Sequence, residues 1–328
     1  MNQQSTASFR DSCGYIFEHG GEIYRCIEPI YHARYRQIMA SGLYETLINR
    51  SLLIQHIEIA PGSMPFAPME KITLKPQKLN LITYPFEWCF CQLKSAALQL
   101  LEIQAIAMEF GMTLRDATPF NHQFKGSRVI FIDTLSFDEY QEGTPWIPYR
   151  QFCENFLAPL VVAKFRDPSF LKFASLSLQG IPLDIAVKLL PFEGYLNFGI
   201  LVHLVGHAKL ANAKGGEGTS KHRVLSRTGL VALIDSLRRS VESLSMPSNR
   251  RSTWSEYRSE SNYNSDDILE KESVVQTFIR TLSPKTVLDI GCNDGRFSRI
   301  AVKCGVASVV AIDSDHLVID RLVRSLIQ

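Results

Sequence analysis

The sequence has no large surplus of either charge. Among its 328 residues, 35 are Lys or Arg and 33 are Asp or Glu, so the formal net charge is +2. A dedicated nucleic-acid-binding protein usually carries a concentrated basic surface, whereas a basic run such as residues 221–227 is equally typical of a solvated linker. We therefore do not expect nucleic acid among the partners.

The sequence also lacks a long uninterrupted apolar run. The longest apolar stretch, residues 195–205, is interrupted by Gly199 and His203 and is too short to cross a bilayer. Residues 1–14 do not show the basic region followed by an apolar core that marks a secretory signal. From these patterns we expect a cytoplasmic protein with no membrane partner.

Complete zinc-binding and serine-hydrolase motifs are absent as well. Cys89 and Cys91 are separated by one residue, but no second close pair of cysteines completes a zinc site, and the odd total of seven indicates reduced thiols. His203 and His207 stand four residues apart without the glutamate of zinc proteases, so we interpret them as structural. The GxSxG pattern is missing, which argues against serine-hydrolase chemistry.

What the sequence does contain is a mixed pattern of strands and helices, which places it in the α/β class. We expect an α+β N-terminal domain over residues 1–210, a polar linker or arm over residues 211–265, and a Rossmann-like unit over residues 266–328.

Within the N-terminal part, the clearest local signals are two helices and a hairpin. Gly20–Gly21 predicts a hairpin turn. The spacing of apolar residues predicts one helix over residues 35–55 and a longer one over residues 87–110, and the apolar run at 129–135 predicts a buried strand.

The strongest motif is VLDIGCNDGRFS at residues 287–298. It predicts a buried strand, a tight turn at Gly291 and Gly295, and the start of a helix. A second apolar strand follows and ends at Asp313, about 20 residues beyond the glycine loop, where an acidic side chain suits the hydroxyl pair of a ribose.

The order of strand, glycine loop, helix, strand and acid resembles the opening of class I S-adenosylmethionine-dependent methyltransferases. That resemblance implies a seven-stranded Rossmann-like domain with S-adenosyl-L-methionine as cofactor. It implies that Asp289 orients the methionine ammonium, that Gly291 and Gly295 lie against the methionine part, and that Asp313 holds the ribose. Asn293, in the same loop, is included among the cofactor-binding candidates. No catalytic base is identified.

Only one amphipathic helix follows Asp313 before residue 328. The resemblance implies several further strands, so we expect an incomplete catalytic domain in a truncated or partial chain with impaired activity, or a partner chain that completes the sheet. The methyl acceptor is expected to be a small molecule or a glycan-type compound.

A second pattern lies upstream. Asp116 and Asn121 are five residues apart, and Asp133 ends an apolar run. This spacing resembles the RD-x4-N loop and metal-binding aspartate of protein-kinase-like phosphotransferases. By resemblance, Asp116 is the base, and Asn121 and Asp133 hold Mg²⁺ with ATP.

The segment departs from that pattern at two places. Leu114 stands where a histidine is usual, and Thr134–Leu135 stands where Phe-Gly is common. No glycine-rich phosphate loop is recognisable upstream, which leaves a kinase-like fold without activity as an alternative.

Taken along its length, the chain resembles a bacterial methyltransferase family related to the rhizobial nodulation protein NoeA. The segments that carry the resemblance are YPFEW (84–88), FIDTLSF (131–137), PWIPYRQFCENFLAPL (145–160) and VLDIGCNDG (287–295). Besides a methyltransferase, a non-catalytic binding module built on the N-terminal domain remains an open alternative.

Overall fold

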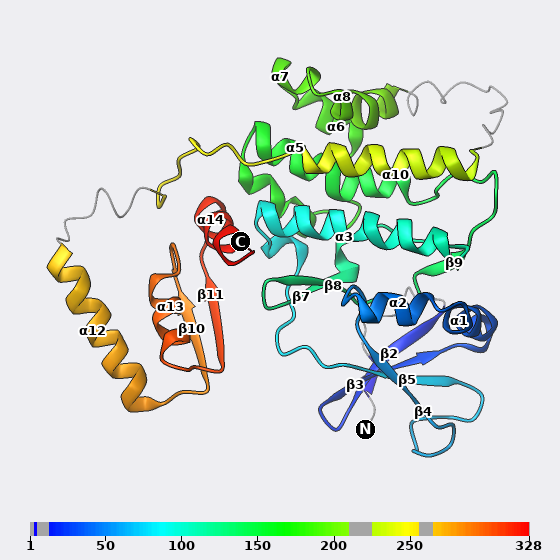
Figure 1. Cartoon of the computed structure of the whole chain (residues 1–328), viewed down its shortest axis with the longest axis horizontal. Helices are drawn as coiled ribbons and strands as arrows, with labels where there is room; N and C mark the ends of the chain where they lie inside the picture. Colours follow the sequence, from blue (N-terminus) through cyan, green and yellow to red (C-terminus); the bar gives the residue numbers. More distant parts are fainter. Residues whose placement is uncertain (1–2, 5–12, 210–224, 256–264, 328) are drawn as a thin grey trace.

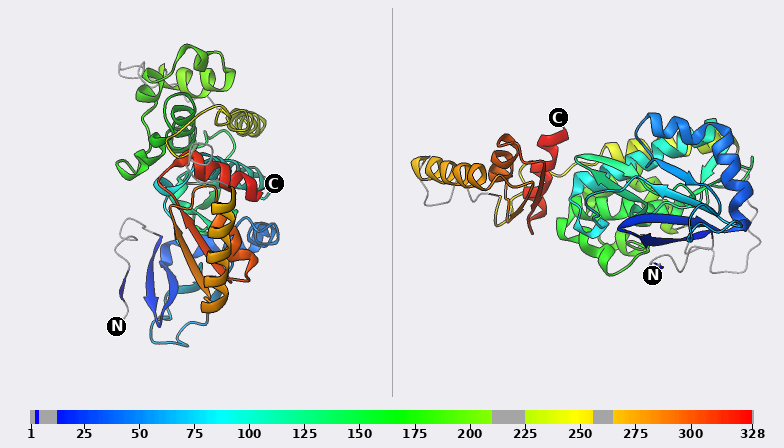
Figure 2. Two further views of the ribbon diagram at one scale, coloured as in Figure 1. Left: turned by 90° about the vertical axis from the view of Figure 1, so that its left-hand side faces the viewer. Right: turned by 90° about the horizontal axis from the view of Figure 1, so that it is seen from below.

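The computed structural model describes residues 3–4, 13–209, 225–255 and 265–327, and it has a mixed α/β architecture, as predicted. A large N-terminal part carries most of the helices, and a smaller C-terminal unit lies beside it rather than within it (Figures 1 and 2). Within the described residues, none of the helices combines the length and the apolar character needed to cross a membrane.

The N-terminal sheet is antiparallel, with the strand order β1-β2-β3-β5-β4. Its central hairpin turns at Gly20–Gly21, as predicted, and both glycines have the positive φ that a tight hairpin turn demands. The strands are β1 (Gln3–Gln4), β2 (Gly14–His19), β3 (Glu22–Ile27), β4 (His56–Ile59) and β5 (Ile72–Pro76).

Two short helices connect β3 to β4, where the sequence predicts one long helix. Helix α1 (Pro29–Ser41) ends at Gly42, and α2 (Leu43–Asn49) starts directly after it. Gly42 has a φ of 84°, a left-handed conformation that stops a helix and that glycine adopts at little cost. The prediction of a continuous helix over residues 35–55 was therefore wrong.

Helix α3 (Phe90–Glu109) is the centre of the N-terminal core, in agreement with the helix predicted over residues 87–110. It is preceded by a 3₁₀ turn, η2 (Pro85–Glu87). Apolar side chains on several of its faces are buried, including Leu100, Leu101 and Ile106. Such burial on more than one face indicates that α3 packs between layers (Figure 1).

The layer on one side of α3 is a set of short strands. The hairpin of β7 (His122–Lys125) and β8 (Arg128–Phe131) turns at Gly126, and β8 ends four residues before the predicted strand does. The remaining elements here are β6 (Met112–Leu114), η3 (Pro119–Asn121) and β9 (Phe137–Glu139), with β6 pairing with β9.

Helices form the layer on the other side of α3. They are α4 (Tyr149–Phe152), η4 (Cys153–Leu157), α5 (Ala158–Phe165), η5 (Pro168–Ser175), α6 (Leu183–Lys188), α7 (Phe192–Tyr195), α8 (Phe198–Ile200), η6 (Leu201–Gly206) and α10 (Arg227–Glu242).

Helix α10 lies in the region expected to be a polar linker, yet it packs along α3. Leu230, Ile234 and Leu237 are buried in the same core cluster as α3. Residues 227–242 are thus part of the N-terminal core. The first part of the expected linker, residues 211–224, lies outside the described residues.

Gln104 connects α3 to the segment that carries the predicted catalytic loop. Its buried amide accepts a hydrogen bond from the Leu114 backbone N–H at 2.8 Å and donates one to the Thr113 hydroxyl at 3.1 Å. We expect Gln104→Leu to lower the free energy of unfolding by about 1–3 kcal/mol, because it leaves a buried backbone N–H without an acceptor. Urea denaturation measures this loss, and an unchanged midpoint would contradict the assigned role.

The C-terminal unit has the predicted order of strand, glycine loop, helix and strand. Strands β10 and β11 pair in parallel, with Asp289 opposite Ala311. Helix α12 packs against α13. The elements are α12 (Ser265–Leu282), β10 (Thr286–Ile290), α13 (Arg296–Lys303), β11 (Ser308–Ile312) and α14 (His316–Ile327).

Candidate functional site

The glycine loop between β10 and α13 has the backbone of a tight ligand-binding turn. Gly291, Asn293 and Gly295 all have positive φ, at 74°, 47° and 76°. The loop folds over the end of β11, since the backbone N–H groups of Gly291 and Cys292 both donate to the Ile312 carbonyl oxygen at 2.8 and 3.0 Å.

Asp313 meets this loop at the same edge of the parallel pair. Its Oδ2 accepts a hydrogen bond from the Asn293 backbone N–H at 2.9 Å, and its Oδ1 accepts one from the Asp315 N–H at 2.9 Å. The predicted loop residue and the predicted distal acid are therefore in direct contact, although they lie 20 residues apart.

Asp289 is held on the other side of the loop. Its Oδ2 accepts a hydrogen bond from the Ser298 hydroxyl at 2.5 Å. Burial, followed by the negative charges of Asp289 and Asp313, raises the pKa of the Cys292 thiol to about 12. Cys292 therefore stays a neutral thiol between the two carboxyl groups, which fits a loop residue and not a nucleophile.

The two glycines of the loop have different surroundings. A Cβ atom added at Gly291 would meet nothing within 4 Å, so this end of the loop is open to a ligand. A Cβ atom at Gly295 would lie 2.6 Å from Leu322 Cδ1 of α14, so this end is closed by packing. Gly291 is thus the position where a cofactor has room to approach the backbone.

A segment that the sequence did not place at the site runs beside the loop. The Trp254 carbonyl oxygen accepts a hydrogen bond from Asn293 Nδ2 at 3.1 Å, and the Trp254 N–H donates to Asp315 Oδ2 at 3.3 Å. The signal in the sequence is the tryptophan itself, which is unusual in a polar linker and indicates docking.

The second predicted constellation also comes together in space. Burial raises the pKa of Asp116, and the nearby negative charge of Asp133 adds to this, while the neighbouring polar side chains of Gln151 and Asn121 act in the opposite direction. Asp116, Asn121 and Asp133 are therefore neighbours around one partly buried carboxyl group.

Arg25 is the residue of this constellation that the sequence did not predict. Its Nη1 lies 2.6 Å from Asp133 Oδ1, so a guanidinium group from β3 already pairs with the carboxylate expected to hold Mg²⁺. Helix α1 holds the same segment, because the Tyr31 hydroxyl lies 2.6 Å from the carbonyl oxygens of Leu135 and Phe137. Strand β3 and helix α1 are distant from Asp133 in sequence, and only the folding of the chain brings them next to it.

His203 has the structural role expected of it. Its Nδ1 lies 2.8 Å from the Tyr149 hydroxyl, and its Nε2 lies 2.9 Å from the Ser236 hydroxyl. Burial, followed by the charge of His207, lowers the pKa of His203 to about 4. The ring is therefore a neutral link between α4, η6 and α10.

Comparison with known proteins gives one informative match. The chain matches no protein-family profile. It is 30% identical over 319 residues to the nodulation protein NoeA of Rhizobium meliloti (strain 1021), and the alignment covers 95% of this chain and 67% of the relative. At this identity and coverage, the chain belongs to the NoeA family of nodulation proteins.

Proposed function

We propose that the C-terminal unit binds S-adenosyl-L-methionine and that the chain is part of a methyltransferase. The observation that carries this proposal is the 2.9 Å hydrogen bond between the Asn293 N–H and Asp313 Oδ2, because it places the glycine loop and the distal acid at one edge of a parallel sheet. Cofactors bind in α/β folds outside the carboxyl ends of the strands.

The side chains at this edge fit the two polar ends of the cofactor. Each oxygen of Asp313 accepts one hydrogen bond from a backbone N–H, and a carboxylate oxygen has a second lone pair with which to accept from a ribose hydroxyl. Asp289 has one oxygen engaged by Ser298 and the other to offer to an ammonium group. The open space at Gly291 admits the methionine part.

When bound, the cofactor supplies an electrophilic methyl group for an in-line displacement. The contribution of the described residues is binding and orientation, which place the methyl group for attack by the acceptor. We infer from the NoeA relationship that this activity serves nodulation. We propose a small-molecule or glycan-type compound as the methyl acceptor.

Gly291→Val tests the proposal against a matched control, Gly305→Val. Both glycines have positive φ, at 74° and 85°, and an added Cβ meets nothing within 4 Å at either position, so the backbone strain is similar. Gly291 lies in the loop before α13, and Gly305 follows its far end. We expect Gly291→Val to weaken cofactor binding by about tenfold or more, a loss of about 1.4 kcal/mol.

Equilibrium dialysis with radiolabelled S-adenosylmethionine measures this difference, with S-adenosylhomocysteine as competitor. Gly305→Val is expected to keep the affinity of the unmodified chain. Equal affinities for the two variants would contradict the placement of the cofactor on the glycine loop.

A second candidate function is nucleotide binding in the N-terminal part, favoured by the convergence of Asp116, Asn121 and Asp133. In this alternative, Asp116 acts as the base of a phosphotransfer, and Asn121 and Asp133 hold Mg²⁺ with ATP.

Asp133→Asn is expected to remove the Mg²⁺-dependent part of ATP binding, because the amide keeps the shape of the side chain and loses the charge that a cation needs. Titration with a fluorescent ATP analogue, with and without Mg²⁺, measures it. Asp138→Asn, at an aspartate of β9 that pairs with Arg34, is the control. ATP affinity that does not respond to Mg²⁺ or to Asp133→Asn would exclude this candidate.

A further inference from the structure

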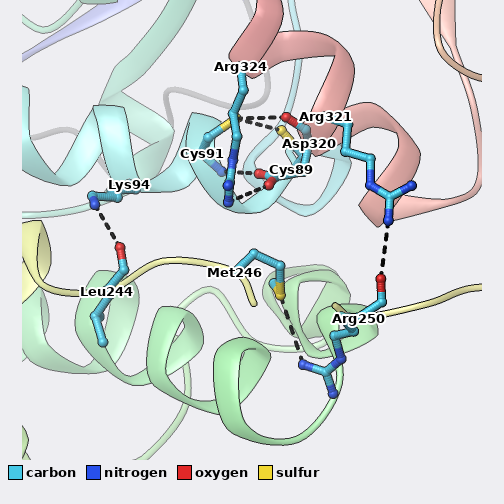
Figure 3. Close-up of polar contacts among 9 residues, drawn as sticks. All are labelled: Cys89, Cys91, Lys94, Leu244, Met246, Arg250, Asp320, Arg321 and Arg324. Atoms are coloured by element: carbon cyan, nitrogen blue, oxygen red, sulfur yellow. Dashed lines mark hydrogen bonds and ion pairs between the residues drawn. The ribbon is translucent and has the colours of Figure 1, made fainter. Parts of the chain in front are cut away.

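Three side chains that can bind a metal ion meet where α14 packs against the start of α3. The Cys89 and Cys91 sulfur atoms lie 3.4 Å apart, and a carboxylate oxygen of Asp320 completes a set in which the three candidate ligand atoms lie within 4.8 Å of one another (Figure 3). The cysteines and the aspartate are about 230 residues apart in sequence, so the sequence alone could not join them.

Burial of the charged Asp320 side chain lowers the stability of the folded chain unless other groups compensate the charge. Asp320 is 2% exposed, and a buried charge is destabilising unless it is paired and hydrogen-bonded. Here Oδ1 accepts a hydrogen bond from the Cys91 N–H at 2.7 Å, and Oδ2 pairs with Arg324 at 2.7 Å. The cluster thus lies at the positive end of the α3 helix dipole, with a compensating cation beside it.

We propose that Cys89, Cys91 and Asp320 bind Zn²⁺ and thereby fasten the C-terminal unit to the N-terminal core. Zn²⁺ accepts sulfur and carboxylate ligands in a tetrahedral arrangement, with Zn–S bonds of about 2.3 Å, which corresponds to about 3.8 Å between two sulfur ligands. The sulfur atoms need to separate by only a few tenths of an ångström to reach that spacing. Water takes the fourth position.

The charges balance at this site. Binding replaces the protons of the two thiols, which pass to solvent, so Zn²⁺ with two thiolates and one carboxylate carries a net charge of −1. Arg324, which already pairs with Asp320, and the N-terminus of α3 neutralise that charge.

The site has a structural consequence for the cofactor loop. Helix α14 begins three residues after Asp313, and its Leu322 packs against Gly295 of the loop. An ion at Asp320 therefore holds the helix that supports the loop. The Zn²⁺ site does not depend on the proposed cofactor, because its ligands Cys89, Cys91 and Asp320 lie where α14 meets α3 and none of them belongs to the glycine loop.

Cobalt substitution of the full chain tests the proposal. The reduced chain is stripped with a chelator and given one equivalent of Co²⁺. We expect a thiolate-to-cobalt charge-transfer band together with the intense visible bands of tetrahedral Co²⁺, and both are expected to disappear when one equivalent of Zn²⁺ is added. A folded, fully reduced chain that shows no charge-transfer band would overturn the proposal.

Variants assign the signal to the cluster. The double variant Cys89→Ser/Cys91→Ser is expected to lose the charge-transfer band, whereas Cys304→Ser, at a half-buried cysteine outside the cluster, is expected to keep it. Asp320→Asn, which keeps an acceptor for the Cys91 N–H, is expected to weaken Zn²⁺ binding while circular dichroism stays unchanged. A band that persists in the double cysteine variant would overturn the assignment.

Discussion

Asp313→Ala is expected to weaken S-adenosylmethionine binding by about tenfold to a hundredfold. A hydrogen bond to a charged group contributes about 1.5–3 kcal/mol, and the substitution removes the carboxylate proposed to hold the ribose. It also removes the acceptor of the Asn293 and Asp315 N–H groups, so the glycine loop loses its anchor at the end of β11.

Isothermal titration of the variant and the unmodified chain measures the effect. The matched control is Glu270→Ala, which removes a negative charge from the exposed face of α12 in the same unit. Asp313→Asn separates the two roles, because the amide oxygen still accepts from one backbone N–H but carries no charge. An unchanged dissociation constant in Asp313→Ala would show that the acid does not contact the cofactor.

Acidification is expected to destabilise the N-terminal part steeply between about pH 6.5 and pH 4. Burial lowers the pKa of His56 to about 4, of His122 to about 3 and of His203 to about 4. In this pH window the unfolded chain binds a proton at each ring and the folded chain does not, so each fall in pH favours unfolding. This loss of stability is absent at pH values above the pKa of histidine in the unfolded chain, and it grows as the pH falls below that value.

The size of this effect is up to about 1.4 kcal/mol for each pH unit and each histidine, hence up to about 4 kcal/mol per unit for the three together. Urea denaturation at pH 7, 6 and 5 measures it. His203→Gln keeps polar groups towards Tyr149 and Ser236 but does not titrate, so its stability is expected to depend on pH about one third less steeply. A free energy of unfolding that is flat over this range would contradict the burial of neutral rings.

Local signals in the sequence were sufficient for much of the fold. The hairpin at Gly20–Gly21, the apolar helix α3 and the strand-loop-helix-strand order of the C-terminal unit all follow from periodicity and glycine positions, and the structure has each of them. The same signals failed at Gly42, because a single glycine inside an otherwise helical pattern is compatible with either continuation or a stop.

The remaining features depend on contacts between distant segments. Helix α10 has a polar neighbourhood in sequence, and only its packing on α3 shows that it belongs to the core. The Arg25–Asp133 ion pair and the cluster of Cys89, Cys91 and Asp320 join residues more than a hundred positions apart or from different units. No periodicity or spacing rule reports such pairs, since they are fixed by how the elements pack.

The cofactor site was predicted only in part from the sequence. The motif VLDIGCNDG and Asp313 predicted which residues would meet, and the structure brings Asn293 and Asp313 into hydrogen-bonding contact. The position of Trp254 beside the loop was not predicted, because it depends on contacts with residues about 40 to 60 positions away in sequence.

The measurement that tests the central claim most directly is a calorimetric titration of the unmodified 328-residue chain with S-adenosylmethionine. The account predicts saturable binding with one site per chain, and displacement by S-adenosylhomocysteine. A folded chain that shows no heat of binding and no displacement would contradict the proposal that the glycine loop and Asp313 form a cofactor site.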